Sequence, residues 1–137
     1  MNRFFEAMKN SKITNLFAEA AGNNMESRFR HWLYDPVKTL QGAEIQPGDT
    51  VLEVGCGSGF FTVPAARLIG EQGRLVAMDV WPAYVERVSK KTRSANLKNV
   101  LVMEGDALDT GLDGASMDAV MLFGVIPFPL LPLNRLL

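Results

Sequence analysis

The segment best suited to chemistry is residues 50–60, which read Thr-Val-Leu-Glu-Val-Gly-Cys-Gly-Ser-Gly-Phe. Three glycines, Gly55, Gly57 and Gly59, follow a short apolar run at alternate positions. Glycine adopts backbone angles that other residues avoid and lets the main chain approach a ligand closely, so this spacing predicts a bound small molecule. The carboxylate of Glu53 suits a ligand with an ammonium group better than one with a pyrophosphate. The alternative is an ordinary tight turn between a strand and a helix.

Two further acids lie where later strands are expected to end. Asp79 lies 20 residues beyond Gly59 (79 − 59 = 20), the distance at which an acid after the second strand reaches a ribose. One ionised carboxylate can accept from both ribose hydroxyls. Asp106 follows the third expected strand. The alternatives are a strand-end or helix-capping acid for Asp79 and a local turn bond for Asp106.

These residues need a sheet to position them, and the chain from residue 50 onward alternates strand and helix patterns. We expect strands over residues 50–55, 74–79, 99–104 and 118–123. Starts about 20 to 25 residues apart are typical of β-α-β units, and they predict an α/β fold with a doubly wound parallel sheet. The third crossover, rich in turn residues, is expected to be mostly loop. The carboxyl ends of such strands share one edge, where ligands bind.

The helices between these strands are predicted from their apolar faces. Pro64 must lie in the first turn of the first helix, and Pro82 begins the second. In the second helix Val85 and Val88 are expected to face inward. The side chains expected to face water are Glu86, Arg87, Lys90, Lys91 and Arg93.

Residues 1–46 form a predicted amino-terminal helical segment of several short helices. Asp35-Pro36 is expected to be the cap and first position of the last helix, which ends at Gly42. The segment either packs on the side of the sheet or forms a lid over the substrate. The lid candidates are Arg28, His31, Trp32 and Tyr34.

Composition excludes several classes of protein. A net charge of −1, from 14 basic and 15 acidic residues, provides no field for general nucleic-acid binding. The single cysteine excludes an internal disulfide framework and a cysteine-based metal site, and no metal is predicted. The amino terminus lacks a signal-peptide pattern, so a cytoplasmic protein is expected. The uncharged run 119–133 contains three prolines and is too short and broken to span a membrane.

The pattern Glu53-x-Gly55-x-Gly57-x-Gly59 resembles the first motif of class I S-adenosylmethionine-dependent methyltransferases. It differs from the dinucleotide motif G-x-G-x-x-G, whose third glycine would fall at Phe60. The likeness covers roughly residues 47–127 and is strongest to the ubiquinone and menaquinone biosynthesis type. It implies a Rossmann-like domain over residues 47–137 with strand order 3-2-1-4, truncated after the fourth strand.

The resemblance also implies a cofactor site for S-adenosylmethionine. Glu53 and the glycine loop would hold the methionine part, Asp79 the ribose, residues 80–81 the adenine face, and residues 106–107 the adenine edge. The end of the fourth strand would border the transferred methyl group, with Phe128 as a further wall. The cofactor-binding residues implied are Glu53, Gly55, Cys56, Gly57, Ser58, Gly59, Asp79, Val80, Trp81, Asp106, Ala107, Phe123 and Gly124. Cys56 is expected to be a small packed side chain, and no catalytic base is predicted.

The predicted function is methyl transfer to a small-molecule acceptor. Residues 124–128 lack the Asn-Pro-Pro-aromatic pattern of enzymes that methylate exocyclic amines of bases or side-chain amides. The alternatives are a non-catalytic, truncated cofactor-binding module and an NAD-dependent oxidoreductase. Because the fourth strand would be an exposed edge, we expect either a missing carboxyl-terminal half or a partner, such as a second copy, to cover it.

Overall fold

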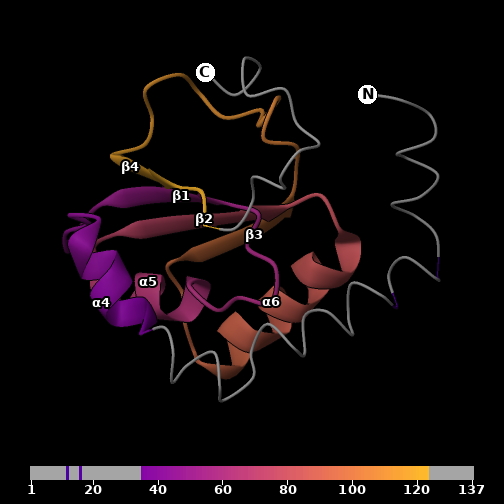
Figure 1. Cartoon of the computed structure of the whole chain (residues 1–137), viewed down its shortest axis with the longest axis horizontal. Coiled ribbons are helices and arrows are strands. Elements are labelled where there is room, and N and C mark those ends of the chain that lie inside the picture. Colours follow the sequence, from indigo (N-terminus) through magenta and orange to yellow (C-terminus); the bar gives the residue numbers. More distant parts are fainter. Residues whose placement is uncertain (1–11, 13–15, 17–34, 124–137) are drawn as a thin grey trace.

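The computed structural model describes residues 12, 16 and 35–123 (Figure 1). Helices expected before residue 35 lie outside these residues. So do some individual candidates, namely Arg28, His31, Trp32, Tyr34, Gly124 and Phe128.

A four-stranded parallel sheet forms the centre of the described region. Its strands are β1 (Thr50–Val54), β2 (Arg74–Asp79), β3 (Val100–Glu104) and β4 (Ala119–Met121). Their order is β3-β2-β1-β4, with every neighbouring pair parallel. The α/β fold class and the order 3-2-1-4 are therefore confirmed. Strand order reverses between β1 and β4, which is where such sheets bind ligands.

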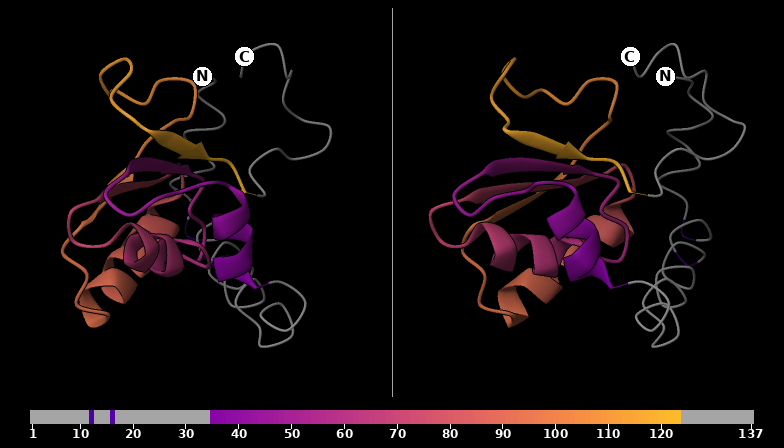
Figure 2. Two further views of the ribbon diagram at one scale, coloured as in Figure 1. Left: turned by 90° about the vertical axis from the view of Figure 1, so that its left-hand side faces the viewer. Right: turned by 60° about the vertical axis from the view of Figure 1, so that its left-hand side comes forward.

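Three helices cover one face of this sheet (Figures 1 and 2). They are α4 (Pro36–Gly42), α5 (Thr62–Ile69) and α6 (Pro82–Ser94). Asp35 caps α4 as predicted, because its Oδ1 accepts from the N–H of Val37 at 2.9 Å. Each predicted proline lies in the first turn of its helix. Even α6, the longest of the three at 13 residues, is shorter than the roughly 20 residues that a bilayer requires.

A loop, residues 105–118, covers much of the other face (Figure 2). Side chains of β1 and β2, including Leu52 and Met78, form an apolar cluster there. Loop residues Leu112 and Met117 pack against this cluster. The prediction that the third crossover is mostly loop is confirmed, and the loop takes the place of a covering helix.

Two strands, β3 and β4, begin one residue later than predicted, and β4 also ends two residues earlier, at Met121. Side-chain hydrogen bonds explain where the two strands begin. Asp118 accepts from the N–H of Thr50 at 2.7 Å and donates its own N–H to the Thr50 carbonyl at 2.8 Å. The ladder of β4 starts only after this pair. Before β3, the Asn99 side chain donates to the carbonyls of Ala66 and Gly70 at the end of α5, both at 2.8 Å. Asn99 therefore belongs to a helix cap as well as to the sheet edge.

Candidate functional site

The glycine loop, residues 55–59, leaves the carboxyl end of β1. Gly55, Gly57 and Gly59 have φ values of 72°, 52° and 81°. This left-handed region is costly for residues with a Cβ, so the alternating glycines are required by the path of the backbone. The predicted strand end at residue 55 is one residue too long, because Gly55 already belongs to the loop.

Most amide groups of the glycine loop already have acceptors inside the protein. The N–H groups of Gly55 and Cys56 both donate to the Met78 carbonyl, at 2.7 and 2.9 Å. Gly57 donates to Asp79 Oδ2 at 2.9 Å, and Gly59 donates to the Cys56 carbonyl at 2.9 Å. A loop that binds phosphate points such N–H groups at its ligand. In this loop, four of the N–H groups instead donate to acceptors inside the protein.

Asp79 joins the glycine loop to the end of β2. The side chain is 6% exposed, and its two oxygens accept from the N–H groups of Gly57 and Trp81 at 2.9 and 3.0 Å. Burial raises the pKa of Asp79, and these backbone N–H groups oppose that change. The backbone N–H of Val80 also lowers this pKa. A carboxylate has about four lone-pair sites, so the group retains capacity for a further donor.

Glu53 lies on the helix side of β1 and is 4% exposed. The hydroxyl of Thr62, in the first turn of α5, donates to Glu53 Oε2 at 2.7 Å. The pKa of Glu53 is raised to about 8, mainly by burial and also by the charge of Asp79, although Thr62 and Lys91 act to lower it. The carboxyl is therefore mostly protonated at neutral pH, and a nearby cation would favour its ionised form.

Lys91 lies against the loop, which corrects the prediction that it faces water. Its side chain is half-buried, and its Nζ approaches the carbonyl oxygens of Ser58 and Gly59 at 3.5 and 3.3 Å. Arg87 is also half-buried, whereas Glu86, Lys90 and Arg93 are exposed as expected. The apolar stripe of α6 was predicted correctly only at Val88, which is fully buried; Val85 is half-buried, and the buried ring on this helix is Tyr84.

Two side chains of the loop itself are buried. The Cys56 side chain packs with Ala77 and Val88, as expected, and burial raises the pKa of its thiol. A protonated thiol is a poor nucleophile, which agrees with a packing role. Ser58 is 0% exposed, and its hydroxyl has no hydrogen-bond partner among the described residues. Unsatisfied buried hydroxyls are uncommon and often mark a group that a ligand completes.

Asp106, the acid after β3, makes a local turn hydrogen bond, which was the alternative to a ligand contact. Asp106 Oδ1 accepts from the N–H of Leu108 at 2.9 Å, and the Asp106 carbonyl accepts from Asp109 at 3.0 Å. Ala107 packs on the apolar cluster of the opposite face. Asp106 follows the carboxyl edge of β3, and its hydrogen bonds are to its own loop and not to Glu53, the glycine loop or Asp79.

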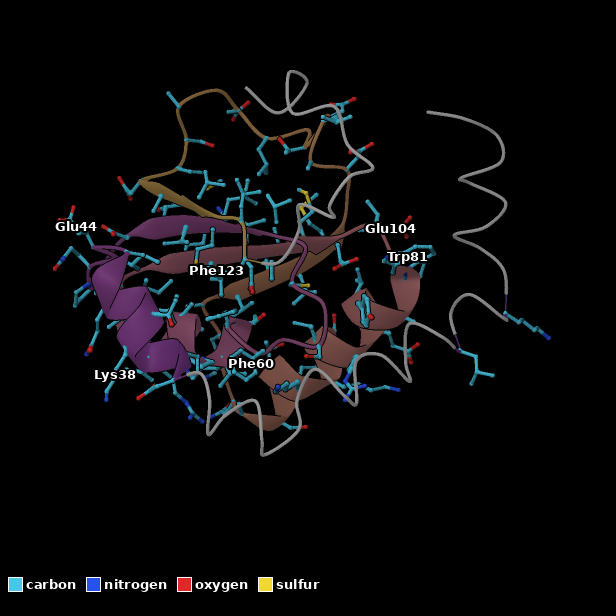
Figure 3. All side chains as sticks on the ribbon, in the orientation of Figure 1. Lys38, Glu44, Phe60, Trp81, Glu104 and Phe123 are labelled. Atoms are coloured by element: carbon cyan, nitrogen blue, oxygen red, sulfur yellow. The ribbon has the colours of Figure 1, made fainter. Side chains whose placement is uncertain are left out.

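The aromatic candidates lie at two ends of the site (Figure 3). Half-buried Trp81 directly precedes α6, next to half-buried Val80, at the end of the sheet that also bears Glu104. Phe123 lies on the helix side, where its ring stacks on Phe61 with centroids 4.3 Å apart. The stack links the end of β4 to the residues that follow the glycine loop.

The structure thus brings Glu53, the glycine loop, Asp79 and Trp81 together through direct hydrogen bonds or shared neighbours. Sequence reasoning missed Thr62 and Lys91. The signal for Thr62 was a hydroxyl in the first turn of an otherwise apolar helix, nine residues after Glu53. No group of three side chains suited to a metal occurs within the described part of the chain. A surface hollow of about 710 Å³ lies at the opposite edge, between the starts of β2 and β3, away from these residues.

Known proteins resemble this chain over the same region. Residues 51–134 match the family described as "Methyltransferase domain". Aklanonic acid methyltransferase DauC of Streptomyces sp. (strain C5) is 36% identical over 74 residues, which cover 54% of this chain and 34% of that protein. Demethylmenaquinone methyltransferase of Bacillus cereus (strain B4264) is 29% identical over 93 residues, covering 67% of this chain and 39% of that protein.

A solved structure shows the same architecture. The crystal structure of a SAM dependent methyltransferase from Aquifex aeolicus superposes with a TM-score of 0.69 at 30% identity, covering 74% of this chain and 54% of that one. The matches to the two named relatives span about a third to two fifths of those proteins. The family match covers 84 of the 137 residues (134 − 51 + 1 = 84) and includes the glycine loop, Asp79 and Asp106. The chain therefore belongs to the class I S-adenosylmethionine-dependent methyltransferase family.

Proposed function

We propose that the carboxyl edge of this sheet binds S-adenosylmethionine and that the chain takes part in methyl transfer to a small-molecule acceptor. The observation that carries this proposal is the hydrogen bonding of the glycine loop. Four of its N–H groups donate within the protein, and two buried carboxyls, Glu53 and Asp79, lie beside it. Such a site favours a ligand that brings positive charge and hydrogen-bond donors.

The same observation argues against the oxidoreductase alternative. A dinucleotide brings a pyrophosphate, which requires free N–H groups at the loop and the first turn of the following helix. Here the N–H groups of Gly55, Cys56, Gly57 and Gly59 already have acceptors. The charge of the buried Asp79 carboxylate would also repel the phosphate charges.

The proposed contacts follow the chemistry of each group. Glu53 and the glycine loop receive the methionine part, whose ammonium would stabilise the ionised form of Glu53. Asp79 has a lone pair left for a ribose hydroxyl. The buried hydroxyl of Ser58, without a partner among the described residues, is available to a polar ligand atom.

The remaining assignments are proposed from the residues' places along the same edge. Val80 and Trp81 would pack against the adenine. Asp106 and the N–H of Ala107 would meet the adenine edge, and Phe123 and Gly124 would border the reactive sulfur. Gly124 lies outside the described residues, so its assignment rests on the sequence alone.

The cofactor would supply a methyl group bound to a positively charged sulfur, a good leaving group. The protein's part is to hold the acceptor in line with that methyl and to exclude water, so that proximity and orientation provide most of the rate. The stacked pair Phe61 and Phe123 is an apolar wall suited to this task. We propose a small-molecule acceptor because the names of two relatives refer to aklanonic acid and demethylmenaquinone.

Calorimetry on the purified chain tests this proposal. Titration with S-adenosylmethionine and with S-adenosylhomocysteine should give saturable binding, and titration with NADH should give none. Binding of NADH without binding of either adenosyl compound would overturn the proposal. Incubation with a methyl-labelled cofactor and a panel of quinols and aromatic acids then tests transfer. Binding without transfer to any acceptor would favour the non-catalytic module.

A further inference from the structure

The side chain of Lys91 reaches from the last part of α6 to the back of the glycine loop. Its Nζ lies 3.5 Å from the carbonyl oxygen of Ser58 and 3.3 Å from that of Gly59. Short charge-assisted hydrogen bonds measure about 2.7–2.9 Å, so each of these contacts is weak alone and the ammonium bridges the two carbonyls.

The bridge fixes one peptide unit at both ends. The carbonyl of Ser58 and the N–H of Gly59 belong to the same planar peptide and point in opposite directions. The carbonyl meets Lys91, and the N–H donates to the Cys56 carbonyl at 2.9 Å. Rotation of this peptide would therefore break contacts on both sides.

Close packing of the loop on α6 allows this reach. A Cβ placed on Gly59 would lie 3.2 Å from Val88 Cγ2 and 3.4 Å from Lys91 Cδ. Any larger residue at position 59 would push against the helix and the Lys91 stem. Gly59 therefore has two roles, because it adopts the positive φ of 81° and leaves room for the Lys91 side chain.

Lys91 also supplies positive charge close to the buried acids. The groups that face Glu53 are Asp79 from β2, Thr62 from α5 and Lys91 from α6. Of these, Lys91 is the cation, and its charge lowers the pKa of Glu53 against burial and the repulsion from Asp79. The residue therefore acts on both the shape and the charge of the same edge.

We infer that Lys91 is a positioning residue that holds the 58–59 peptide against α6 and keeps the glycine loop in the form that accepts the cofactor. The consequence for binding rests on the proposed function. The effect on the loop itself can be measured without any ligand.

The experiment compares Lys91→Met with Lys90→Met and Lys91→Arg. Methionine keeps the apolar stem and removes the charge. Lys90 is the matched control, because it lies one position earlier on α6, is exposed and pairs with Glu86 at 2.8 Å. Arginine keeps both the charge and the donors. Thermal unfolding by circular dichroism establishes that each variant is folded.

In the ligand-free protein, Lys91→Met should speed hydrogen exchange at the Gly59 amide by about tenfold, the effect of one lost hydrogen bond of ordinary strength. It should also move the carboxyl titration of Glu53, followed by NMR, to higher pH. Lys90→Met should change neither, and Lys91→Arg should stay within about twofold of the wild type at Gly59 if a retained donor suffices. Calorimetry should show about tenfold weaker S-adenosylmethionine binding for Lys91→Met alone.

Unchanged Gly59 exchange and Glu53 titration in Lys91→Met would overturn the inference. So would equal changes in Lys90→Met, because a general charge effect would then explain them. If the ligand-free changes occur but the wild type binds no S-adenosylmethionine, the proposed function fails while the hold of Lys91 on the loop is supported. If Lys91→Met does not fold, Lys91→Arg provides the test. Arginine retains the charge and the N–H donors, so faster Gly59 exchange in Lys91→Arg than in Lys90→Met would contradict the inference.

Discussion

At the amino edge of the sheet, polar side chains complete hydrogen bonds that the backbone needs, whereas at the carboxyl edge they are buried at a cost. Asn99 donates two bonds of 2.8 Å to carbonyls at the end of α5. Asp118 is exposed and accepts from the first residue of β1 at 2.7 Å. Neither group needs a ligand to be satisfied.

The carboxyl edge has the opposite character. Glu53 and Asp79 are 4% and 6% exposed, and burial raises the pKa of each. Ser58 carries a buried hydroxyl with no partner among the described residues. Groups perturbed in this way are typical of functional sites. The contrast separates polar residues that complete the sheet from those that we propose as ligand contacts.

Replacing Asp79 should produce the largest effect. Asp79→Ala removes the acceptor proposed for the ribose and should weaken S-adenosylmethionine binding about 100-fold, or about 2.7 kcal/mol, as expected for a lost charged hydrogen-bonding group. It should also lower stability, because the N–H groups of Gly57 and Trp81 lose their acceptor. Calorimetry measures the first effect and urea unfolding the second.

Asp113→Ala is the control, since Asp113 is exposed on the covering loop. It should leave both quantities unchanged. Equal cofactor affinity in wild type and Asp79→Ala would remove the ribose assignment and with it one side of the comparison.

A substitution at the amino edge of the sheet should lower stability without changing cofactor affinity. Asn99→Ala leaves two carbonyls at the end of α5 without their donor and should lower the free energy of unfolding by about 2 kcal/mol. Cofactor affinity should stay within about twofold, because no contact of Asn99 reaches the glycine loop. Urea unfolding and calorimetry on the same sample test both statements. A large loss of affinity would show that the two edges are coupled.

The pH dependence of stability should report Glu53. The folded-state pKa of Glu53 is about 8, against 4.5 for an unperturbed glutamate. The folded protein therefore holds a proton that the unfolded chain releases, so this contribution to stability is complete below 4.5 and is lost as pH rises through 8. Glu53→Gln lacks this loss. The difference in free energy of unfolding between Glu53→Gln and the wild type should therefore shift by about 1.4 kcal/mol in favour of the variant from pH 7 to pH 9.

Urea unfolding of both proteins at pH 7 and pH 9 provides the measurement, and other titrating groups cancel in the difference. Glutamine still offers Thr62 an acceptor, so packing is preserved. Calorimetry should at the same time show weaker S-adenosylmethionine binding, because the charge opposite the ammonium is gone. Parallel pH curves for the two proteins would contradict the burial cost assigned to Glu53.

The smallest effect is expected at the start of β4. Asp118→Asn keeps the shape of the side chain but weakens its bond to the N–H of Thr50, and should cost about 1 kcal/mol of stability. Cofactor affinity should be unchanged. Thermal unfolding measures the loss of stability. A change in cofactor affinity without a loss of stability would contradict the assignment of Asp118 to the sheet alone.

Regular patterns explain what could be predicted from the sequence. The starts of β1 and β2, the cap of α4 and the start of α6 at Pro82 follow from apolar runs, prolines and glycine turns. The strand order was implied by the family resemblance. The glycine loop and Asp79 could be found because backbone geometry limits which residues fit there. The local turn at Asp106 was foreseen as an alternative but could not be chosen, because a short loop can satisfy an aspartate in either way.

Long or amphipathic side chains account for what was missed. Periodicity places the Cα of Lys91 on the polar side of α6, but its stem is long enough to reach back to the loop. Thr62 was missed because its partner Glu53 lies on another element. The start of β4 depends on a pair formed by Asp118 and Thr50, which no local sequence pattern indicates.

The pair between Thr50 and Asp118 also bears on the order in which the chain folds. These residues are 68 positions apart, whereas β1 and β2 pair across 24 positions (74 − 50 = 24). Closing a longer loop costs more chain entropy before any contact repays it. We expect β1, β2 and β3 to assemble first with α5 and α6, and β4 to dock afterwards. Glu53 and Asp79 at the carboxyl edge would then be in place before Phe123 packs against Phe61.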